Sequence, residues 1–241
     1  MTGVVLVRYL DLDRCGDGPA QRRLLDEDEL ARLGRIAVPR TAARFVAAHA
    51  ALRLTVARYC GVPPGRVRWT RTPNGMPLVA APDPEVRVSL SHTGGHAAVA
   101  VTRGRGIGID LEGAGEPRRL PSSVRGMSVG PGGFPAAWTR MEACVKAVGG
   151  RLTEGLPLLA AGPGVVRAEH GALAGTTWYV RQLAAPPGCA AALAGVGAAP
   201  VAVDLGRFRP PVAWRSGQPG TSERKPETSS VKRSGSSTHG R

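Results

Sequence analysis

The sequence contains few cysteines, few aromatic residues and no long apolar segment. Its four cysteines are Cys15, Cys60, Cys144 and Cys189, and they form no C-x-x-C pair. This wide spacing argues against a zinc site or a disulfide framework and favours a reducing, cytoplasmic environment. No apolar stretch approaches the ~20 residues that a membrane span needs, and the N-terminal segment lacks the basic region of a signal peptide. Aromatic residues make up only 4% of the chain, so no base-stacking platform for nucleic acid is visible.

Positive charge is in excess, with a formal net charge of +14 over 241 residues. From residue 213 onward there are six Lys/Arg and two Asp/Glu, so this tail carries +4 and the remaining body +10. Such an excess favours nucleic acid, phosphorylated ligands or acidic proteins as partners, without choosing among them. Compositional bias toward Arg and Ala explains part of the excess equally well. We expect the tail, which is rich in Ser, Thr, Gly, Pro and charge, to be disordered.

Hydropathy patterns predict a mixture of strands and helices. The predicted helices span residues 24–33, about 42–60 with Thr41 as its cap, and about 135–148. The predicted strands span 1–12, 67–69, 86–90, 97–102, 163–168, 176–183, 189–195 and 200–205. Ser91-His92-Thr93-Gly94-Gly95 is expected to be a turn between two of these strands, and residues 113–135 an irregular connection.

The strand-like segment 106–112 carries the most informative pattern. Ile107, Ile109 and Leu111 alternate there with Gly108, Asp110 and Glu112. Because side chains on a strand change face at every residue, one face is apolar and the other presents two carboxylates side by side. Two such carboxylates repel each other unless a positive group lies between them, and a divalent cation is the natural candidate. Alone, however, this alternation is the ordinary signal of a strand whose polar face is wet.

The helix predicted at 135–148 adds a third carboxylate. Its apolar stripe consists of Trp138, Met141, Val145 and Val148. Glu142 and Lys146 lie four residues apart on an adjacent face, where an exposed ion pair is the simplest interpretation. Combined with Asp110 and Glu112, they form a set of three carboxylates and one lysine. That set suits Mg²⁺, which accepts a few carboxylates and keeps positions open for phosphate oxygens, and it suits phosphoryl transfer.

The expected turn at 91–95 adds hydroxyl groups and an imidazole. Glycine lets the backbone come close to a ligand, and Ser91, His92 and Thr93 can hold phosphate oxygens. A histidine with its hydrogen bonds satisfied in a loop is an equally good interpretation of His92.

Five motifs follow one another in a recognisable order. They are a helix with Arg44 and Arg53, Asn74-Gly75-x-Pro77, Ser89-Leu90-Ser91-His92-Thr93, Gly106-Ile-Gly-Ile-Asp110-Leu-Glu112, and Trp138-Thr-Arg-x-Glu142-Ala-x-x-Lys146-Ala-x-Gly149. This order resembles the Sfp-type 4′-phosphopantetheinyl transferases over about residues 1–210. The last two motifs together are specific, whereas the Gly-x-Pro and Ser-His-Thr elements are weak singly.

The resemblance implies an α+β fold. It would be a monomer of two similar α+β lobes related by pseudo-two-fold symmetry, with coenzyme A bound between them. The expected boundaries are 1–112 for the N-terminal lobe, 113–212 for the C-terminal lobe and 213–241 for the basic tail.

The resemblance also implies a reaction. Mg²⁺ would be held by Asp110, Glu112 and Glu142 together with the coenzyme A pyrophosphate. The serine hydroxyl of an apo acyl or peptidyl carrier domain, from a polyketide or non-ribosomal peptide synthase, attacks the β-phosphate. The 4′-phosphopantetheine arm moves to that serine and 3′,5′-ADP leaves. Lys146 would contact the phosphates, and Glu142 or a metal-coordinated water would take the serine proton.

Further cofactor contacts are implied for Ser91, for His92 and Arg44 at the 3′-phosphoadenosine end, and for Arg32. The positive charge of the body then matches an anionic cofactor and acidic carrier domains. Two positions depart from the family pattern, since Met76 and Met141 stand where lysine is common. The loss of one charged hydrogen bond would weaken binding by ~1.5–3 kcal/mol.

Two alternatives use the same features. Carboxylates, a lysine and a basic surface also serve a metal-dependent phosphodiesterase or nuclease, which would cleave DNA or RNA with Mg²⁺. A non-enzymatic nucleic-acid-binding protein would instead show salt-dependent binding without affinity for coenzyme A.

Overall fold

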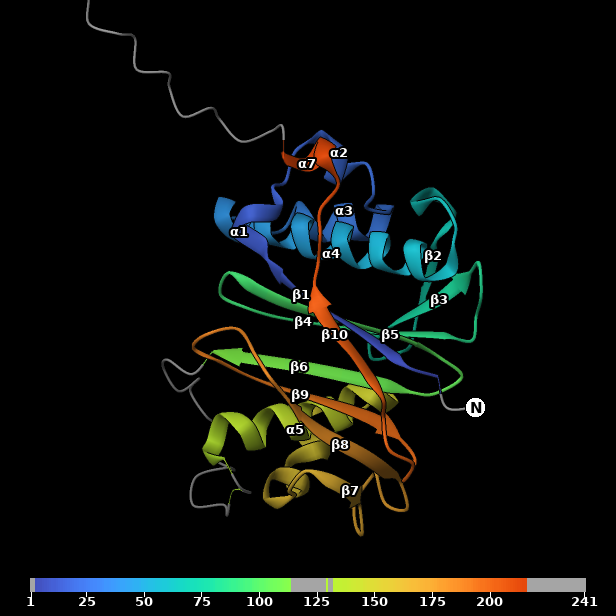
Figure 1. Ribbon diagram of the computed structural model, residues 1–241, viewed down its shortest axis with the longest axis vertical. Helices are drawn as coiled ribbons and strands as arrows, with labels where there is room; N and C mark the ends of the chain where they lie inside the picture. The colour runs from blue at the N-terminus through green and yellow to red at the C-terminus, as the bar shows by residue number, and fades with distance from the viewer. Residues whose placement is uncertain (1–2, 114–128, 130–131, 216–241) are drawn as a thin grey trace, which may run out of the picture.

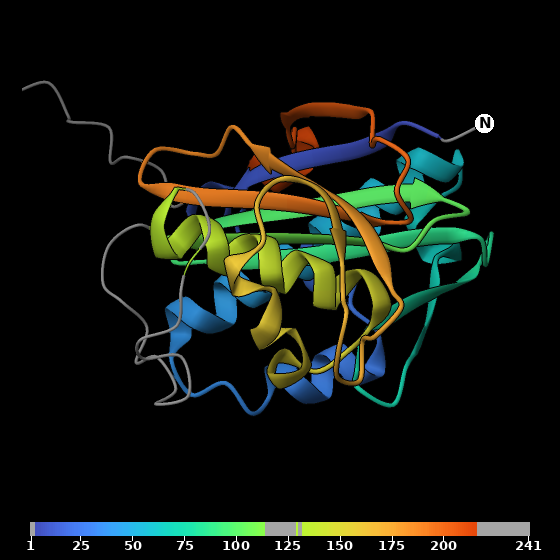
Figure 2. The same ribbon diagram turned by 90° about the horizontal axis from the view of Figure 1, so that it is seen from below.

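The computed structural model describes residues 3–113, 129 and 132–215, which form four layers (Figure 1). Helix α4 (Pro39–Cys60) covers the outer face of one sheet, and helix α5 (Gly133–Val148) covers the outer face of a second sheet. Figure 2 shows α5 lying across this second sheet. The predicted connection over 113–135 and the predicted disordered tail lie largely outside the described residues.

The first sheet has the strand order β10-β1-β5-β4. Its strands are β1 (Val5–Asp11), β4 (Val86–Thr93), β5 (His96–Arg103) and β10 (Val203–Arg207). β5 pairs antiparallel with both β1 and β4, whereas β10 pairs with β1 in parallel. The strand predicted at 200–205 is therefore confirmed as β10, but it forms an edge of the first sheet and not of the second.

The second sheet is antiparallel throughout, with the order β6-β9-β8-β7. Its strands are β6 (Ile107–Gly113), β7 (Gly164–Arg167), β8 (Thr177–Leu183) and β9 (Cys189–Val196). A separate hairpin joins β2 (Arg68–Arg71) to β3 (Pro77–Ala81). Residues 73–75 lie between these two strands, and Gly75 has a φ of 82°, which glycine adopts without strain.

Two helix starts differ from the sequence prediction. α4 begins at Pro39, so Thr41 lies inside the helix and is not its cap. Proline suits this first helical position because its φ is already helical and its missing N–H has no partner there. Helix α3 (Glu27–Leu33) begins later than the predicted residue 24, because Asp26 and Glu29 form a reciprocal capping box. The short helices are α1 (Leu12–Cys15), α2 (Pro19–Arg22), η1 (Pro64–Arg66), α6 (Leu152–Gly155), η3 (Leu156–Ala160) and α7 (Val212–Arg215).

Three apolar cores lie between the four layers. One lies between α4 and the first sheet, and a second lies between α5 and the second sheet. The third fills the space between the two sheets and includes Ile107, Ile109 and Leu111 of β6. The alternation predicted for this strand is confirmed: its apolar side chains face the other sheet, and Asp110 and Glu112 lie on the side of α5.

Helices packed on mainly antiparallel sheets make this an α+β protein, as the sequence predicted. The sheets cross the division expected at residue 112, because β6 precedes it and pairs in the second sheet, while β10 follows it and pairs in the first. The division into two lobes stays a prediction. None of the helices in the described part of the chain has the length and apolarity that crossing a membrane requires.

Candidate functional site

Two glycines, Gly106 just before β6 and Gly108 within it, allow α5 to lie directly on this strand. A Cβ atom at Gly108 would lie 2.0 Å from the carbonyl oxygen of Ala143, and one at Gly106 would lie 2.6 Å from that of Ala147. Any side chain at Gly108 would therefore displace the helix backbone. This close approach brings Glu142 and Lys146 of α5 next to the carboxylates of β6.

Asp110, Glu112 and Glu142 form a compact acidic cluster. They offer ligand oxygens that all lie within 4.8 Å of one another. The side chain of Asp110 is only 2% exposed, and its Oδ2 is buried without a hydrogen-bond partner. An unpaired buried carboxylate oxygen is costly unless a positive group satisfies it. The cluster therefore fits a hard divalent cation such as Mg²⁺, which prefers carboxylate oxygens.

Lys146 lies beside this cluster and contacts two of its members. Its Nζ donates to Asp110 Oδ1, lies 3.3 Å from Glu142 Oε2 and donates to Ser91 Oγ at 3.2 Å. Burial alone would lower the pKa of Lys146, but Asp110 and Glu142 raise it above its usual value. Lys146 is thus held as a cation. The ion pair between Glu142 and Lys146 is present, but it is largely buried beside Asp110 and is not the exposed pair that the spacing alone suggested.

The residues predicted as a turn at 91–93 belong to strand β4, so that prediction is wrong. The strand runs to Thr93, and only Gly94 and Gly95 remain between it and β5. Ser91 is buried and its hydroxyl donates to Asp110 Oδ1 at 2.7 Å, while it accepts from the N–H of Leu111 at 3.2 Å. His92 points the other way along the alternation and is exposed.

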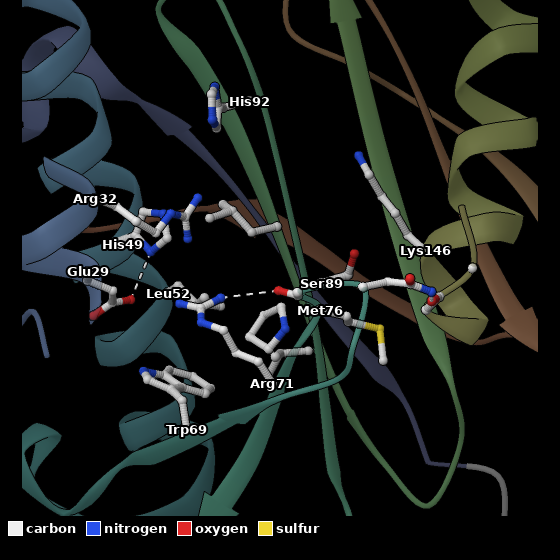
Figure 3. A pocket seen from close by; sticks show the side chains of 17 residues that line it. Glu29, Arg32, His49, Leu52, Trp69, Arg71, Met76, Ser89, His92 and Lys146 are labelled. Atoms are coloured by element: carbon white, nitrogen blue, oxygen red, sulfur yellow. Dashed lines mark hydrogen bonds and ion pairs between the residues drawn. The ribbon is translucent and has the colours of Figure 1, made fainter. Parts of the chain in front are cut away.

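A cavity of about 310 Å³ adjoins Lys146 (Figure 3). Its lining includes three cationic side chains, Arg32 of α3, Arg71 of β2 and Lys146 of α5, and the imidazole of His92. In Figure 3, Arg32 lies on the side of the N-terminal helices and Lys146 on the opposite side. A concave site that gathers positive charge from three elements suits a phosphate-containing ligand.

A buried ionic network supports the cavity on the α3–α4 side. Glu29 accepts from Arg53 at 3.0 Å and shares a 2.8 Å hydrogen bond with His49. Burial alone would raise the pKa of Glu29, but the hydrogen bonds from His49 and the Asp26 N–H, with the charge of Arg53, lower it to about 2. Glu29 and His49 line the cavity, so the charge of this glutamate is already balanced by the protein.

Some of the residues predicted to contact the cofactor line the cavity, and others do not. Arg32 lines the cavity, with its guanidinium 5.2 Å from the centre of the Phe45 ring. Arg44 is absent from that lining and binds both oxygens of Asp13 at 2.8 and 2.9 Å. Its contact with a cofactor stays a prediction, as do those of Ser91 and His92.

Sequence reasoning missed Arg71 and the role of the β2–β3 turn. Asn74 Nδ2 donates to the carbonyl oxygen of Gly149 at 2.9 Å, and Met76 packs against the same glycine. The turn thus packs against the C-terminal end of α5. Met141 is fully buried against Gly155, which fits its place in the predicted apolar stripe. The sequence shows that Arg71 comes shortly before an Asn-Gly turn. It does not show that this arginine lines the cavity.

The fold and the site together define an α+β protein with a carboxylate cluster beside a cation-lined cavity. No protein-family model matches the chain. Over 90 residues, 36% of its length, the chain is 39% identical to the 4′-phosphopantetheinyl transferase HetI of Nostoc sp., covering 38% of that protein. Over 155 residues, 57% of its length, it is 28% identical to a putative 4′-phosphopantetheinyl transferase of Synechocystis sp., covering 62% of that protein.

These matches confirm the resemblance that the motifs predicted. The chain is similar to 4′-phosphopantetheinyl transferases, and each match spans less than two thirds of the relative's length.

Proposed function

We propose that this protein transfers the 4′-phosphopantetheine arm of coenzyme A to a serine of an apo carrier protein. The observation that carries the proposal is the cluster of Asp110, Glu112 and Glu142 with Lys146 beside it, next to the cation-lined cavity. The similarity to two named transferases of this type supports it. The proposed enzyme is of the holo-[acyl-carrier-protein] synthase type and Mg²⁺-dependent.

Each group of the cluster has a defined task in this reaction. Asp110, Glu112 and Glu142 would hold Mg²⁺, which when bound neutralises charge on the pyrophosphate. Lys146 binds a phosphate oxygen as a point charge. Glu142 accepts the proton of the carrier serine while the serine oxygen forms a new bond to the β-phosphorus. The bond from that phosphorus to the 3′,5′-ADP oxygen breaks, and 3′,5′-ADP leaves.

The cavity provides the site for the anionic cofactor. Arg32, Arg71 and His92 line it and can hold the phosphates of the 3′-phosphoadenosine end. We propose further that coenzyme A lies between two lobes related by pseudo-two-fold symmetry. The proposed partners are acyl or peptidyl carrier domains of polyketide or non-ribosomal peptide synthases, and the proposed enzyme is cytoplasmic and monomeric.

The test is incubation of the protein with coenzyme A, Mg²⁺ and an apo carrier, followed by mass spectrometry of the carrier. The carrier should gain the mass of one phosphopantetheine. Asp110→Asn and Glu142→Gln should fold and yet lose more than the ~10–100-fold that removal of an outer metal-site partner costs. The absence of a mass gain across fatty-acid, polyketide and peptide carriers, or cleavage of DNA or RNA in the same buffer, would contradict the proposal.

A further inference from the structure

Three hydroxyl groups join the two sheets at the edge next to the acidic cluster. β4 and β6 are edge strands of different sheets, and Ser89, Ser91 and Thr93 are alternate residues of β4. Each hydroxyl accepts a hydrogen bond from a backbone N–H of β6. Ile109 donates to Ser89 at 3.0 Å, Leu111 to Ser91 at 3.2 Å, and Gly113 to Thr93 at 3.3 Å. We call this row of three bonds the hydroxyl seam.

The seam holds the backbone on both sides of each carboxylate of β6. Asp110 lies between Ile109 and Leu111, and Glu112 lies between Leu111 and Gly113, so both have two anchored neighbours. The bonds repeat at every second residue with a constant offset of 20 in sequence. β6 therefore cannot slide or tilt along β4 without breaking several of them.

The middle hydroxyl of the seam also orients Asp110 directly. A serine hydroxyl has one donor and two acceptor positions. Ser91 donates to Asp110 Oδ1 and accepts from the Leu111 N–H and from Lys146, so all three positions are in use. Oδ1 of Asp110 is thereby held by protein groups, and the buried Oδ2 is left for another partner.

We propose that the hydroxyl seam is a positioning device for the cation site. Ser89 and Thr93 act through the β6 backbone, and Ser91 acts on Asp110 itself, so that Asp110 Oδ2 and Glu112 meet Glu142 of α5 in one place. This inference rests on the proposed function in so far as the cation site belongs to it. Ser89 contributes this hydrogen bond and a part of the cavity wall.

The test compares Ser89→Ala with Thr55→Val in the full chain. Thr55 is a matched control, because it is also a buried hydroxyl with one backbone hydrogen bond, to Ala51 O at 2.7 Å within α4. Mn²⁺ alone is titrated and the free ion is measured by electron paramagnetic resonance. Ser89→Ala should weaken Mn²⁺ binding by about tenfold, the lower end of the usual cost of losing an outer metal-site partner. Ser89→Thr, which keeps the hydroxyl, and Thr55→Val should both bind Mn²⁺ with the affinity of the wild-type protein.

Amide hydrogen exchange of Ile109 and Leu111 gives a second readout that needs no metal. Exchange should accelerate in Ser89→Ala and not in Thr55→Val. Thr93→Val, nearly isosteric, should act in the same way on Gly113 and serves if Ser89→Ala does not fold. Unchanged exchange, or Mn²⁺ affinity equal to that of Thr55→Val, would overturn the positioning role. A wild-type protein that binds no Mn²⁺ would instead overturn the metal site of the proposed function, while exchange still decides whether the seam exists.

Discussion

The positive charge of the cavity comes from three elements that are distant in sequence. Arg32 lies on α3, Arg71 on β2 and Lys146 on α5. Lys146 lies at the cation site, whereas Arg32 and Arg71 line other parts of the cavity and can bind phosphates away from that site. Arg71 is half-buried and lines the same cavity as Met76, a position where the resemblance leads us to expect lysine. Arg71 can therefore supply a cation that the Gly-x-Pro motif lacks here.

Arg71→Ala tests this assignment. The variant loses one charged hydrogen bond, which typically contributes ~1.5–3 kcal/mol. We expect the KM for coenzyme A to rise about tenfold to a hundredfold, with a smaller change in kcat. Arg66→Ala is the control, since Arg66 is exposed and lies outside the cavity lining. An unchanged KM in Arg71→Ala, measured by carrier labelling at varied coenzyme A, would remove Arg71 from the site.

The buried Glu29 network predicts how stability depends on pH. The pKa of Glu29 is lowered to about 2 in the folded protein, from 4.5. A carboxyl group with a lowered folded pKa stabilises the fold above its unfolded pKa, and this contribution is lost as pH falls through the folded value. Unfolding should therefore become easier from about pH 4.5 down to about 2. Glu29→Gln should lose stability at neutral pH and show a shallower slope over this range in urea unfolding; an unchanged slope would contradict the assignment.

At the scale of elements, the contact between α5 and β6 builds the site. It depends on Gly108, whose Cβ position is already filled by the backbone of Ala143. The sequence shows only a glycine within an alternating strand, which usually marks a close backbone approach. The structure identifies what approaches: the helix that carries Glu142 and Lys146.

Gly108→Ala should push α5 away from β6. Overpacking of this kind costs ~1–3 kcal/mol, and a displacement of about 1 Å can cost a hundredfold in rate. We expect a lower Tm and a loss of carrier labelling of about that size. Gly65→Ala is the control, because a Cβ there meets nothing within 4 Å. Full activity of Gly108→Ala would show that the helix position does not matter for the reaction.

Elements with a local period were predictable, and those that depend on distant partners were not. The acidic face of β6 and the apolar stripe of α5 follow from spacing alone, because burial repeats with the period of the strand or helix. Ser, His and Thr before two glycines predict a turn at 91–93, whereas these residues belong to β4. The hydroxyls of β4 accept hydrogen bonds from backbone N–H groups of β6, 20 residues later in the chain. No local sequence pattern encodes this long-range pairing. The parallel pairing of β10 with β1 spans nearly the whole described chain and left no signal either.

At the scale of the whole molecule, the two sheets exchange strands across the middle of the chain. β10 extends the first sheet and β6 begins the second, so each sheet includes a strand from the other half. The inter-sheet core adds a second dependence, because Val5, Val7 and Ala98 of the first half pack with Leu193 and Val201 of the second. Neither half can bury its inner sheet face alone.

This exchange predicts that the halves unfold together. Residues 1–215 should show one thermal transition by circular dichroism. Fragments 1–112 and 113–215, made separately, should show no cooperative transition, because the first lacks β10 and the partner of β6, and the second lacks β6 and the partner of β10. Mixing the fragments should restore a transition, since the apolar faces of both sheets are then covered. A sharp transition in either fragment alone would show that a lobe folds independently, in spite of its missing edge strand.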